Sequence, residues 1–495
     1  MPLILGTNSI KDTGFDVSNS VRLNSGSSDA LTKTFSGAGN RRTLTMSMWM
    51  KRSKNISSGT DRVFGWKNNG GNYGFQFDND QLRIYFDGSG GTNSTILTNR
   101  VFRDPSAWIH LLFKVDTTQS TEADRMRLYI NGTEETSFSS RVYPALNEQG
   151  GMNLGNICKI GRSSVATNSY YDGYLCELAF IDGTAVAHTE FGEFDSDSPT
   201  IWKPKDISGL TFGTNGFYLQ FKESGTSQNS SGLGADTSGN DNHFAVENLT
   251  SVDQSTDTCT NNFCTFTTTH PSAANFTLSE GNLKVVKSAV FTGGLSGSSI
   301  MPTTGKWYFE ALINEAGNGD RTRVGVINYS TQVENNDTGT LNKEGSSLSG
   351  VTTSCKSAKH FETVNGSTTE YTNSGDFADG NIVQFAMDLD NKAIYIGRNG
   401  TFLTQSGSSG GNPASGSSKT GAISTNTTIM NGEPMSAFLG HSAGQSDQSD
   451  ISFNFGSPPY SESGGNSDGN GYGNFNQSVP SGYYALNTKN LAEFG

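Results

Sequence analysis

Hydrophobic and polar residues alternate with a period of two along much of the chain, and this pattern predicts β-strands. The clearest run is 43–53, where one face carries Leu44, Met46, Met48 and Met50 and the other carries Thr45, Ser47, Trp49 and Lys51. Comparable runs occur at 62–66, 73–78, 82–88, 107–116, 125–130, 157–161 and 174–183, separated by clusters of Gly, Asn, Asp or Ser. Regular short strands of this kind predict a sandwich. The one helix-like stretch, 184–194, allows about three turns at most.

One hairpin pattern occurs twice, at 125–136 and at 391–402. In each copy an alternating run stops at Asn-Gly, which is Asn131-Gly132 in the first and Asn399-Gly400 in the second. Asn and Gly tolerate the positive φ that tight hairpin turns require. Each copy is therefore predicted to be a strand, a two-residue turn and a second strand.

Composition agrees with an all-β fold. Hydrophobic residues make up 33% of the chain and charged residues 16%, while Gly, Phe and Tyr number 60, 30 and 16. The aromatic content suits half-buried strands and argues against disorder. A chain of 495 residues exceeds what one core usually serves, so we expect two or three domains.

The charge and the cysteines restrict partners and compartment. A net charge of −13 argues against nucleic acid, because binding phosphates requires a surplus of Lys and Arg. The first ten residues resemble neither a secretory signal nor an anchor, and no apolar run is long enough for a membrane span. The five cysteines, Cys158, Cys176, Cys259, Cys264 and Cys355, fit synthesis in a reducing cytoplasm. Cys259 and Cys264 are close enough in sequence to pair, but we expect free thiols.

Five segments in order, SMWMKR, WIHLLFKVD, LYINGTEE, KIGR and YYDGYLCELAFIDG, resemble the laminin-G/concanavalin-A-like lectin pattern over residues 15–200. The resemblance implies two curved antiparallel sheets of jelly-roll type with a concave face that often holds sugar. Residues 276–457, with GKWYFEALI, RVGVIN, GNIVQFAMDLDNKAIYIGRNGTF and ISFNFGSPPY, resemble a SPRY domain, a class of protein-interaction module. The long insert at 331–376 departs from a minimal SPRY pattern. Two concanavalin-A-like sandwiches are thus expected.

The remaining segments complete the expected domain organisation. Residues 201–275 are predicted to form a structured, β-rich connector, because aromatic and aliphatic residues interrupt their turn-forming residues. Residues 1–14 are expected to be an N-terminal docking segment, and 458–495 a Gly/Ser/Asn-rich C-terminal tail.

The complete sequence also resembles lectin-like virion proteins of marine tailed bacteriophages. The shared segments include RVFRDPSAWIH, YDGYLCELAFIDGTAV, SGNDNHFAVENLTSVDQSTDT and PSGYYALNTKNL. This resemblance implies a structural or receptor-binding part of a tail fibre or other appendage on the virion surface, made in the bacterial host cytoplasm. Other virion proteins would be its partners, and a homotrimer is the expected oligomer.

Two patterns would suit enzymes. GHSAG at 440–444 satisfies the G-x-S-x-G elbow with Ser442 as nucleophile, but a strand and no helix follows it. The concanavalin-like fold also hosts glycoside hydrolases, which need two nearby carboxyl groups. Candidate pairs come from two short acidic runs, namely Glu193, Asp195 and Asp197, and Asp388 and Asp390. Both runs are better explained as turns, so catalysis is not expected.

Metal and sugar sites have weaker signals. The six histidines lack the spacing of a zinc site. Calcium is the one ion left open, because Asp236, Asn240, Asp241 and Asn242 offer oxygen ligands, although an ordinary Asx-rich turn explains them as well. Sugar binding needs an aromatic plane beside polar groups. Two clusters offer this combination. The first is Trp66, Asn68, Asn69, Asn72 and Tyr73, and the second is Tyr170, Tyr171 and Asp172. The same aromatic residues would also suit a core or a subunit interface.

The function expected from the sequence is therefore non-catalytic binding of host-surface carbohydrate by a virion appendage. A polysaccharide-degrading glycoside hydrolase and a purely structural or capsid-decorating protein are the alternatives.

Overall fold

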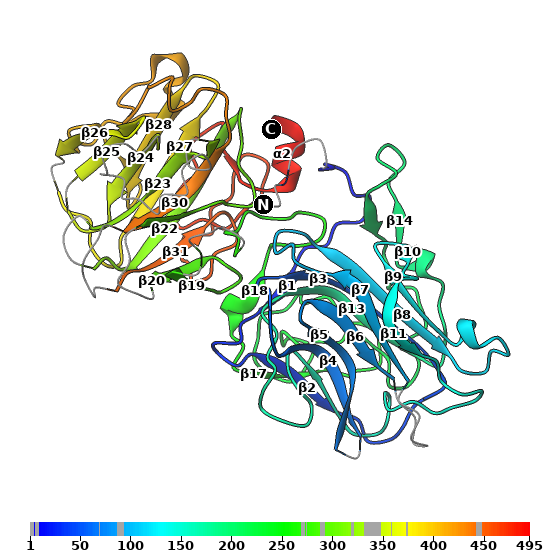
Figure 1. The fold of residues 1–495 in the computed structure, drawn as a ribbon. Coiled ribbons are helices and arrows are strands. Elements are labelled where there is room, and N and C mark those ends of the chain that lie inside the picture. The colour runs from blue at the N-terminus through cyan, green and yellow to red at the C-terminus, as the bar shows by residue number, and fades with distance from the viewer. Residues whose placement is uncertain are drawn as a thin grey trace. The chain divides into compact units, whose positions relative to one another are not determined.

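The computed structural model describes residues 4, 9–68, 70–86, 94–268, 273, 275–287, 293–317, 321–330, 348–357, 359–372, 375–441 and 448–495. The chain divides into two compact units (Figure 1). The first unit is Thr13–Asn262, and the second unit combines Met1–Asp12 with Phe263–Gly495. The all-β prediction is confirmed, since nearly every regular element described is a strand.

Two large antiparallel sheets build the first unit. Within the described residues, one has the order β10-β9-β8-β3-β13-β1-β18 with β16 beside β13, and the other has the order β11-β7-β6-β5-β4-β12-β2-β17. We call these sheet A and sheet B. The strands of sheet A are β1 (Ser20–Leu23), β3 (Thr43–Arg52), β8 (Ile109–Asp116), β9 (Met126–Ile130), β10 (Thr133–Glu134), β13 (Gly173–Asp182), β16 (Phe217–Leu219) and β18 (Gln254–Ser255). Those of sheet B are β2 (Ala30–Thr34), β4 (Thr60–Asn68), β5 (Gly71–Asp78), β6 (Gln81–Tyr85), β7 (Thr95–Val101), β11 (Phe138–Val142), β12 (Ile157–Ile160) and β17 (Ala245–Glu247).

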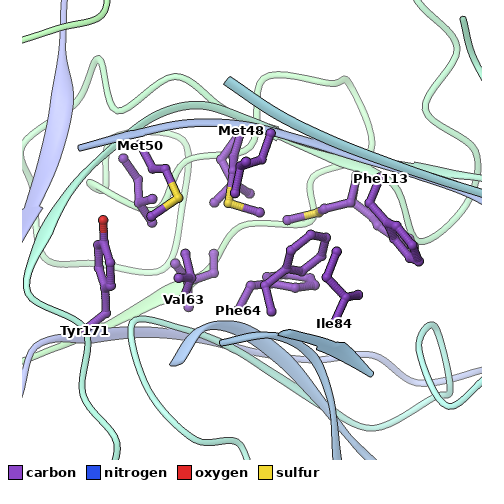
Figure 2. Packing of buried hydrophobic residues seen from close by; sticks show 14 of the residues in the cluster. Met48, Met50, Val63, Phe64, Ile84, Phe113 and Tyr171 are labelled. Atoms are coloured by element: carbon purple, nitrogen blue, oxygen red, sulfur yellow. The ribbon is translucent and has the colours of Figure 1, made fainter. Parts of the chain in front are cut away.

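The core of the first unit lies between these two sheets. Met48 and Met50 of sheet A face Phe64 and Ile84 of sheet B (Figure 2). The predicted alternation of β3 is confirmed, because its methionines are completely buried in this core while Trp49 points to the other side of the sheet. Burial of such apolar side chains supplies the main driving force for packing the sheets.

In the described part of the first unit, a short hairpin and three 3₁₀ turns accompany the two sheets. They are β14 (Gly192–Phe194), β15 (Trp202–Pro204), η2 (Glu122–Asp124), η3 (His188–Glu190) and η4 (Ser251–Asp253). The prediction of a helix at 184–194 is wrong, because only His188–Glu190 is helical there. Gly192 instead begins β14, where its Cα lies against the Trp202 ring and leaves no room for a side chain.

The second unit also contains two sheets. Among its described residues, the first sheet has the order β19-β20-β31-β22-β27-β28-β29 with β32 beside β22, and the second has the order β21-β30-β23-β24-β25-β26. The strands are β19 (Phe276–Ser279), β20 (Lys284–Lys287), β21 (Gly293–Ser296), β22 (Lys306–Glu315), β23 (Thr322–Asn328), β24 (Gly350–Ser354), β25 (Lys359–Val364), β26 (Ser367–Thr372), β27 (Ile382–Asp388), β28 (Ala393–Arg398), β29 (Thr401–Phe402), β30 (Met435–His441), β31 (Asp450–Asn454) and β32 (Tyr484–Ala485). The helices described in this unit are η7 (Pro413–Ser418) and α2 (Thr488–Phe494).

Both predicted hairpins are confirmed. Asn131 and Gly132 have φ of 47° and 74° between β9 and β10, and Asn399 and Gly400 have φ of 48° and 88° between β28 and β29. Two successive positive φ angles are the signature of the type I′ turn, whose twist matches that of the flanking strands.

The unit boundaries differ from the segments expected from the sequence. Residues 201–262 belong to the first unit, where β16 pairs with β13, β17 with β2 and β18 with β1. Residues 458–495 belong to the second unit, and Phe475, Tyr483 and Leu491 are buried there. Each of these segments completes a folded unit by adding short strands or buried side chains to it.

Candidate functional site

The two outer faces of the sandwich differ in how much of the chain covers them. On sheet A, Trp49, Trp108 and Trp202 are buried together outside the main core. His110 is buried beside them, where its Nδ1 accepts a hydrogen bond from Trp202 Nε1 at 3.1 Å. Burial lowers the pKa of His110 to about 3, so this ring is neutral. The outer face of sheet A is thus covered by the protein's own aromatic side chains.

The outer face of sheet B carries polar groups instead. Because side chains alternate along strands, the pairs Phe64–Phe75 and Trp66–Tyr73 point to the core, whereas Gly65 pairs with Gly74 on the outer side. Figure 1 shows β4, β5 and β6 side by side, and Tyr85 of β6 pairs with Gly74. A Cβ at Gly65 would lie 2.2 Å from the Asn72 side chain, so the missing side chain at Gly65 makes room for Asn72.

Two arginines flank that ring. The guanidinium carbons of Arg62 and Arg83 lie 6.0 Å and 5.5 Å from the centroid of Tyr85, within the range of a cation–π contact. Arg83 pairs with Asp78, and Arg62 bonds to Asn72. Desolvation lowers the pKa of Arg62, although this group stays protonated at neutral pH. Tyr85 and both arginines are half-buried, so part of each remains accessible to a ligand.

Asn72 lies at the centre of a hydrogen-bonded array. In the orientation that matches donors with acceptors, its carboxamide oxygen accepts from Arg62 Nε at 3.0 Å, Ser163 Oγ at 3.0 Å and Ser164 N at 3.1 Å. Its amide nitrogen donates to Ser164 Oγ at 2.9 Å. These bonds join β5 to the loop 161–172 and fix polar groups in defined directions, as a sugar site requires.

The same loop brings Tyr170 to this face. Arg62 N donates to Ser169 O at 2.9 Å, and Tyr170, the next residue, is half-buried with the Arg162 guanidinium 5.8 Å from its ring centroid. Arg162 in turn pairs with Glu247 at 2.7 Å. We define the polar face as Arg62, Asn72, Tyr85, Arg162 and Tyr170.

The structure therefore joins one residue from each predicted sugar cluster, Asn72 and Tyr170. Two other predicted residues require correction. Trp66 and Tyr171 are completely buried in the core, so their rings stabilise the sandwich and do not form a sugar platform. Tyr73 is half-buried and packs against that core, and its contact with sugar stays a prediction.

The remaining predicted sugar ligands have structural partners or are buried. Asn68 is buried at the end of β4, and Asn69 lies outside the described residues. Asp172 accepts hydrogen bonds from Ser25 N at 2.7 Å and Ser25 Oγ at 2.6 Å, and thereby holds the turn that follows β1. Tyr85 and the arginines were missed, although the outward position of Tyr85 between Ile84 and Phe86 was visible as period-two alternation.

Most of the predicted calcium ligands have hydrogen-bond partners within the protein. Asp236 is buried, and its two carboxylate oxygens accept from Tyr218 N, Ser238 N, Ser238 Oγ and Asn242 N at 2.8–2.9 Å. Asn240 Nδ2 donates to Gly213 O at 2.6 Å, whereas the Asp241 side chain is 90% exposed. Among the described residues no group of three or more His, Cys, Asp or Glu is arranged to hold a metal ion. Calcium binding stays a prediction.

The candidate catalytic acids are held in turns. Asp195 accepts from the backbone N–H groups of Asp197 and Ser198 at 3.0 Å and 2.8 Å. Asp388 is buried against Lys306 at 2.9 Å, and Asp390 accepts from Gly305 N at 2.8 Å. These contacts explain the acids without catalysis.

Ser442 of the G-x-S-x-G match lies outside the described residues. His441 ends β30, and its Nε2 lies 2.7 Å from buried Lys287 Nζ.

No helix in the described part of the chain is long and apolar enough to cross a bilayer.

Comparison with known proteins agrees with this architecture. Residues 21–189 match the family described as the concanavalin A-like lectin/glucanases superfamily. The first unit has a concanavalin-A-like lectin fold. No curated protein sequence matches the chain.

Several solved structures are similar to the chain. A putative carbohydrate binding protein from Bacteroides ovatus is 10% identical, with 47% of this chain and 59% of that chain covered and a TM-score of 0.31. A heptameric SAP-like pentraxin from Limulus polyphemus is 15% identical, with coverage of 35% and 81% and a TM-score of 0.26. The SPRY domain of human HERC1 is 13% identical, with coverage of 34% and 87% and a TM-score of 0.23.

Proposed function

We propose that the protein is a component of a bacteriophage virion appendage that binds host-surface carbohydrate through the polar face, without catalysis. The observation that carries this proposal is the link of two half-buried tyrosines to the hydrogen-bonded array of Asn72 through Arg62. The Arg62 guanidinium lies 6.0 Å from the Tyr85 ring, and Arg62 N bonds to Ser169, the residue before Tyr170. Sugars present apolar C–H faces and ring hydroxyls, which aromatic planes and fixed amide, hydroxyl and guanidinium groups complement.

The virion role is supported by the resemblance of the sequence to lectin-like proteins of marine tailed bacteriophages. The lectin fold of the first unit supports the choice of carbohydrate over other host-surface ligands. The negative net charge of −13 disfavours nucleic acid as a ligand.

A glycan array with the intact protein tests the proposal. We expect saturable binding to bacterial surface polysaccharide, and a decrease of about tenfold or more in affinity for Tyr85→Ala and for Tyr170→Ala, because each loses its aromatic plane. Tyr371→Ala is the matched control, since Tyr371 is a half-buried tyrosine on β26 of the second unit.

Other outcomes of this experiment would point to another function, another binding site or a required ion. Shortening of the polysaccharide would support the hydrolase, and a complete lack of glycan binding would leave only a structural role. If Tyr85→Ala, Tyr170→Ala and Tyr371→Ala bound glycan equally well, the polar face would not be the binding site. Repeating the array in the presence of a chelator tests the calcium prediction. Loss of glycan binding under this condition would show that binding requires a divalent ion.

A further inference from the structure

Two cysteines that are distant in sequence lie close together on the outer side of sheet A. Cys176 Sγ and Cys259 Sγ are 3.6 Å apart. Cys176 lies on β13, paired with Trp49 of β3, and Cys259 lies beyond β18 in a turn near the end of the first unit. Both sulfurs belong to the aromatic cluster that covers this face.

The turn that carries Cys259 is held firmly. Thr258 and Asn261 exchange two backbone hydrogen bonds of 3.2 Å, so that Cys259 occupies the turn between them. The Thr260 hydroxyl accepts from Val17 N at 3.0 Å. The preceding residue Asp257 is buried and pairs with Lys51 Nζ at 2.7 Å. These contacts keep the Cys259 sulfur beside Cys176.

The two thiols differ in accessibility. Cys176 is completely buried, whereas Cys259 is half-buried. Cys158, Cys264 and Cys355 are each buried. An oxidant therefore reaches Cys259 first, and Cys176 is placed to complete the reaction.

We propose that Cys176 and Cys259 form a disulfide when the protein passes from a reducing cytoplasm to an oxidising medium. The sulfurs must approach by about 1.5 Å to reach the S–S distance of about 2.05 Å. A side-chain rotation at half-buried Cys259 supplies a movement of this size.

The reaction balances with a small-molecule disulfide such as oxidised glutathione. The Cys259 thiolate attacks one glutathione sulfur and releases the first glutathione thiol. The Cys176 thiolate then attacks the Cys259 sulfur, which forms the protein disulfide and releases the second. The two protein protons pass to the two glutathione molecules. Burial raises the pKa of Cys259, so exchange is slow near neutral pH and faster at higher pH.

The bond would fasten the end of the first unit. It joins β13, a central strand of sheet A, to the turn that precedes Asn262, the last residue of that unit. This inference does not depend on sugar binding, because it requires only exposure to an oxidant.

Mass spectrometry of the intact protein, purified under reduction and then incubated with oxidised glutathione, tests the inference. We expect a loss of two hydrogen atoms and one cross-linked peptide pair joining Cys176 to Cys259. The oxidised first unit should unfold about 5 °C or more above the reduced one, because the bond closes a long loop. Cys355→Ser is the control and should form the same bond.

Three results would overturn the inference. They are a stable glutathione adduct on Cys259 without a cross-link, a cross-link between other cysteines, and an unchanged mass at a pH where free model thiols react completely. Peptide mapping of the wild-type chain gives the answer even where a cysteine variant fails to fold. Cys259→Ser should then lose both the cross-link and the redox-dependent shift in unfolding temperature.

Discussion

Glu177 is a buried acid in an unusual backbone conformation. Its φ is 48° within β13, where the register with β3 shifts between Cys176 and Ala179. The Tyr218 hydroxyl donates a hydrogen bond to its carboxyl group. Burial, which is the main cause, raises the pKa of Glu177 to about 8, so the carboxyl group is largely protonated at neutral pH.

This raised pKa predicts a pH-dependent stability. The unfolded state releases the proton near the ordinary pKa of 4.5 and the folded state only near 8, so the stabilising contribution is full below about pH 4.5 and is lost as the pH rises to about 8. We expect Glu177→Gln to remove this part of the pH dependence, which amounts to at most about 1.4 kcal/mol per pH unit.

Denaturant titrations between about pH 5 and about pH 8 check this, followed by the fluorescence of the tryptophans in the first unit. Asp61, whose pKa is raised by burial to about 6, contributes a slope of the same sign in both proteins. The difference between wild type and variant therefore isolates Glu177. Identical slopes would show that this carboxyl group does not titrate as described.

At the scale of elements, β4 and β5 approach closely through their glycines. Gly74 has a φ of 147°, and a Cβ there would lie 2.2 Å from Phe64 O of β4. Such an atom would collide with backbone that cannot move without breaking the ladder.

We therefore expect Gly74→Ala to destabilise the first unit by about 2 kcal/mol or more. Gly209→Ala is the matched control, because no atom lies within 4 Å of the Cβ that it would add. Its effect should stay within about 0.5 kcal/mol. The urea midpoints of the two variants measure this difference. Equal losses of stability in both variants would contradict the close approach of Gly74 to the backbone of β4.

The long strands and both hairpins were predictable, because period-two alternation and Asn-Gly turns are local signals. The sequence left Trp66 open between a sugar platform and the core, and its pairing with Tyr73 beside Phe64 and Phe75 places it in the core. The polar face could not be assembled from the sequence, since Asn72 is linked to Tyr170 through hydrogen bonds of Arg62 and the loop 161–172. The pairing of residues 201–262 with the first unit could not be read from the sequence, because β16, β17 and β18 have only three, three and two residues.

At the scale of the whole molecule, the core cluster of the first unit is formed entirely by its own residues. We expect residues 13–262, produced alone, to unfold in one cooperative thermal transition and to bind the same glycans as the intact chain. Circular dichroism and the array measure these two properties. Aggregation of this fragment, or loss of its glycan binding, would show that the rest of the chain is needed. Sedimentation of the intact chain tests the predicted homotrimer.

The first unit is inserted into the second in the order of the chain, since Met1–Asp12 belongs with Phe263–Gly495. Ile4 and Lys11 anchor the N-terminal segment through Ser299 O and Glu493, at 3.0 Å and 2.7 Å. The chain therefore passes between the two units at two places, near residues 12 and 262. A protease that cuts the chain at one of these positions leaves the units covalently joined at the other, so release of the first unit would require two separate cleavages.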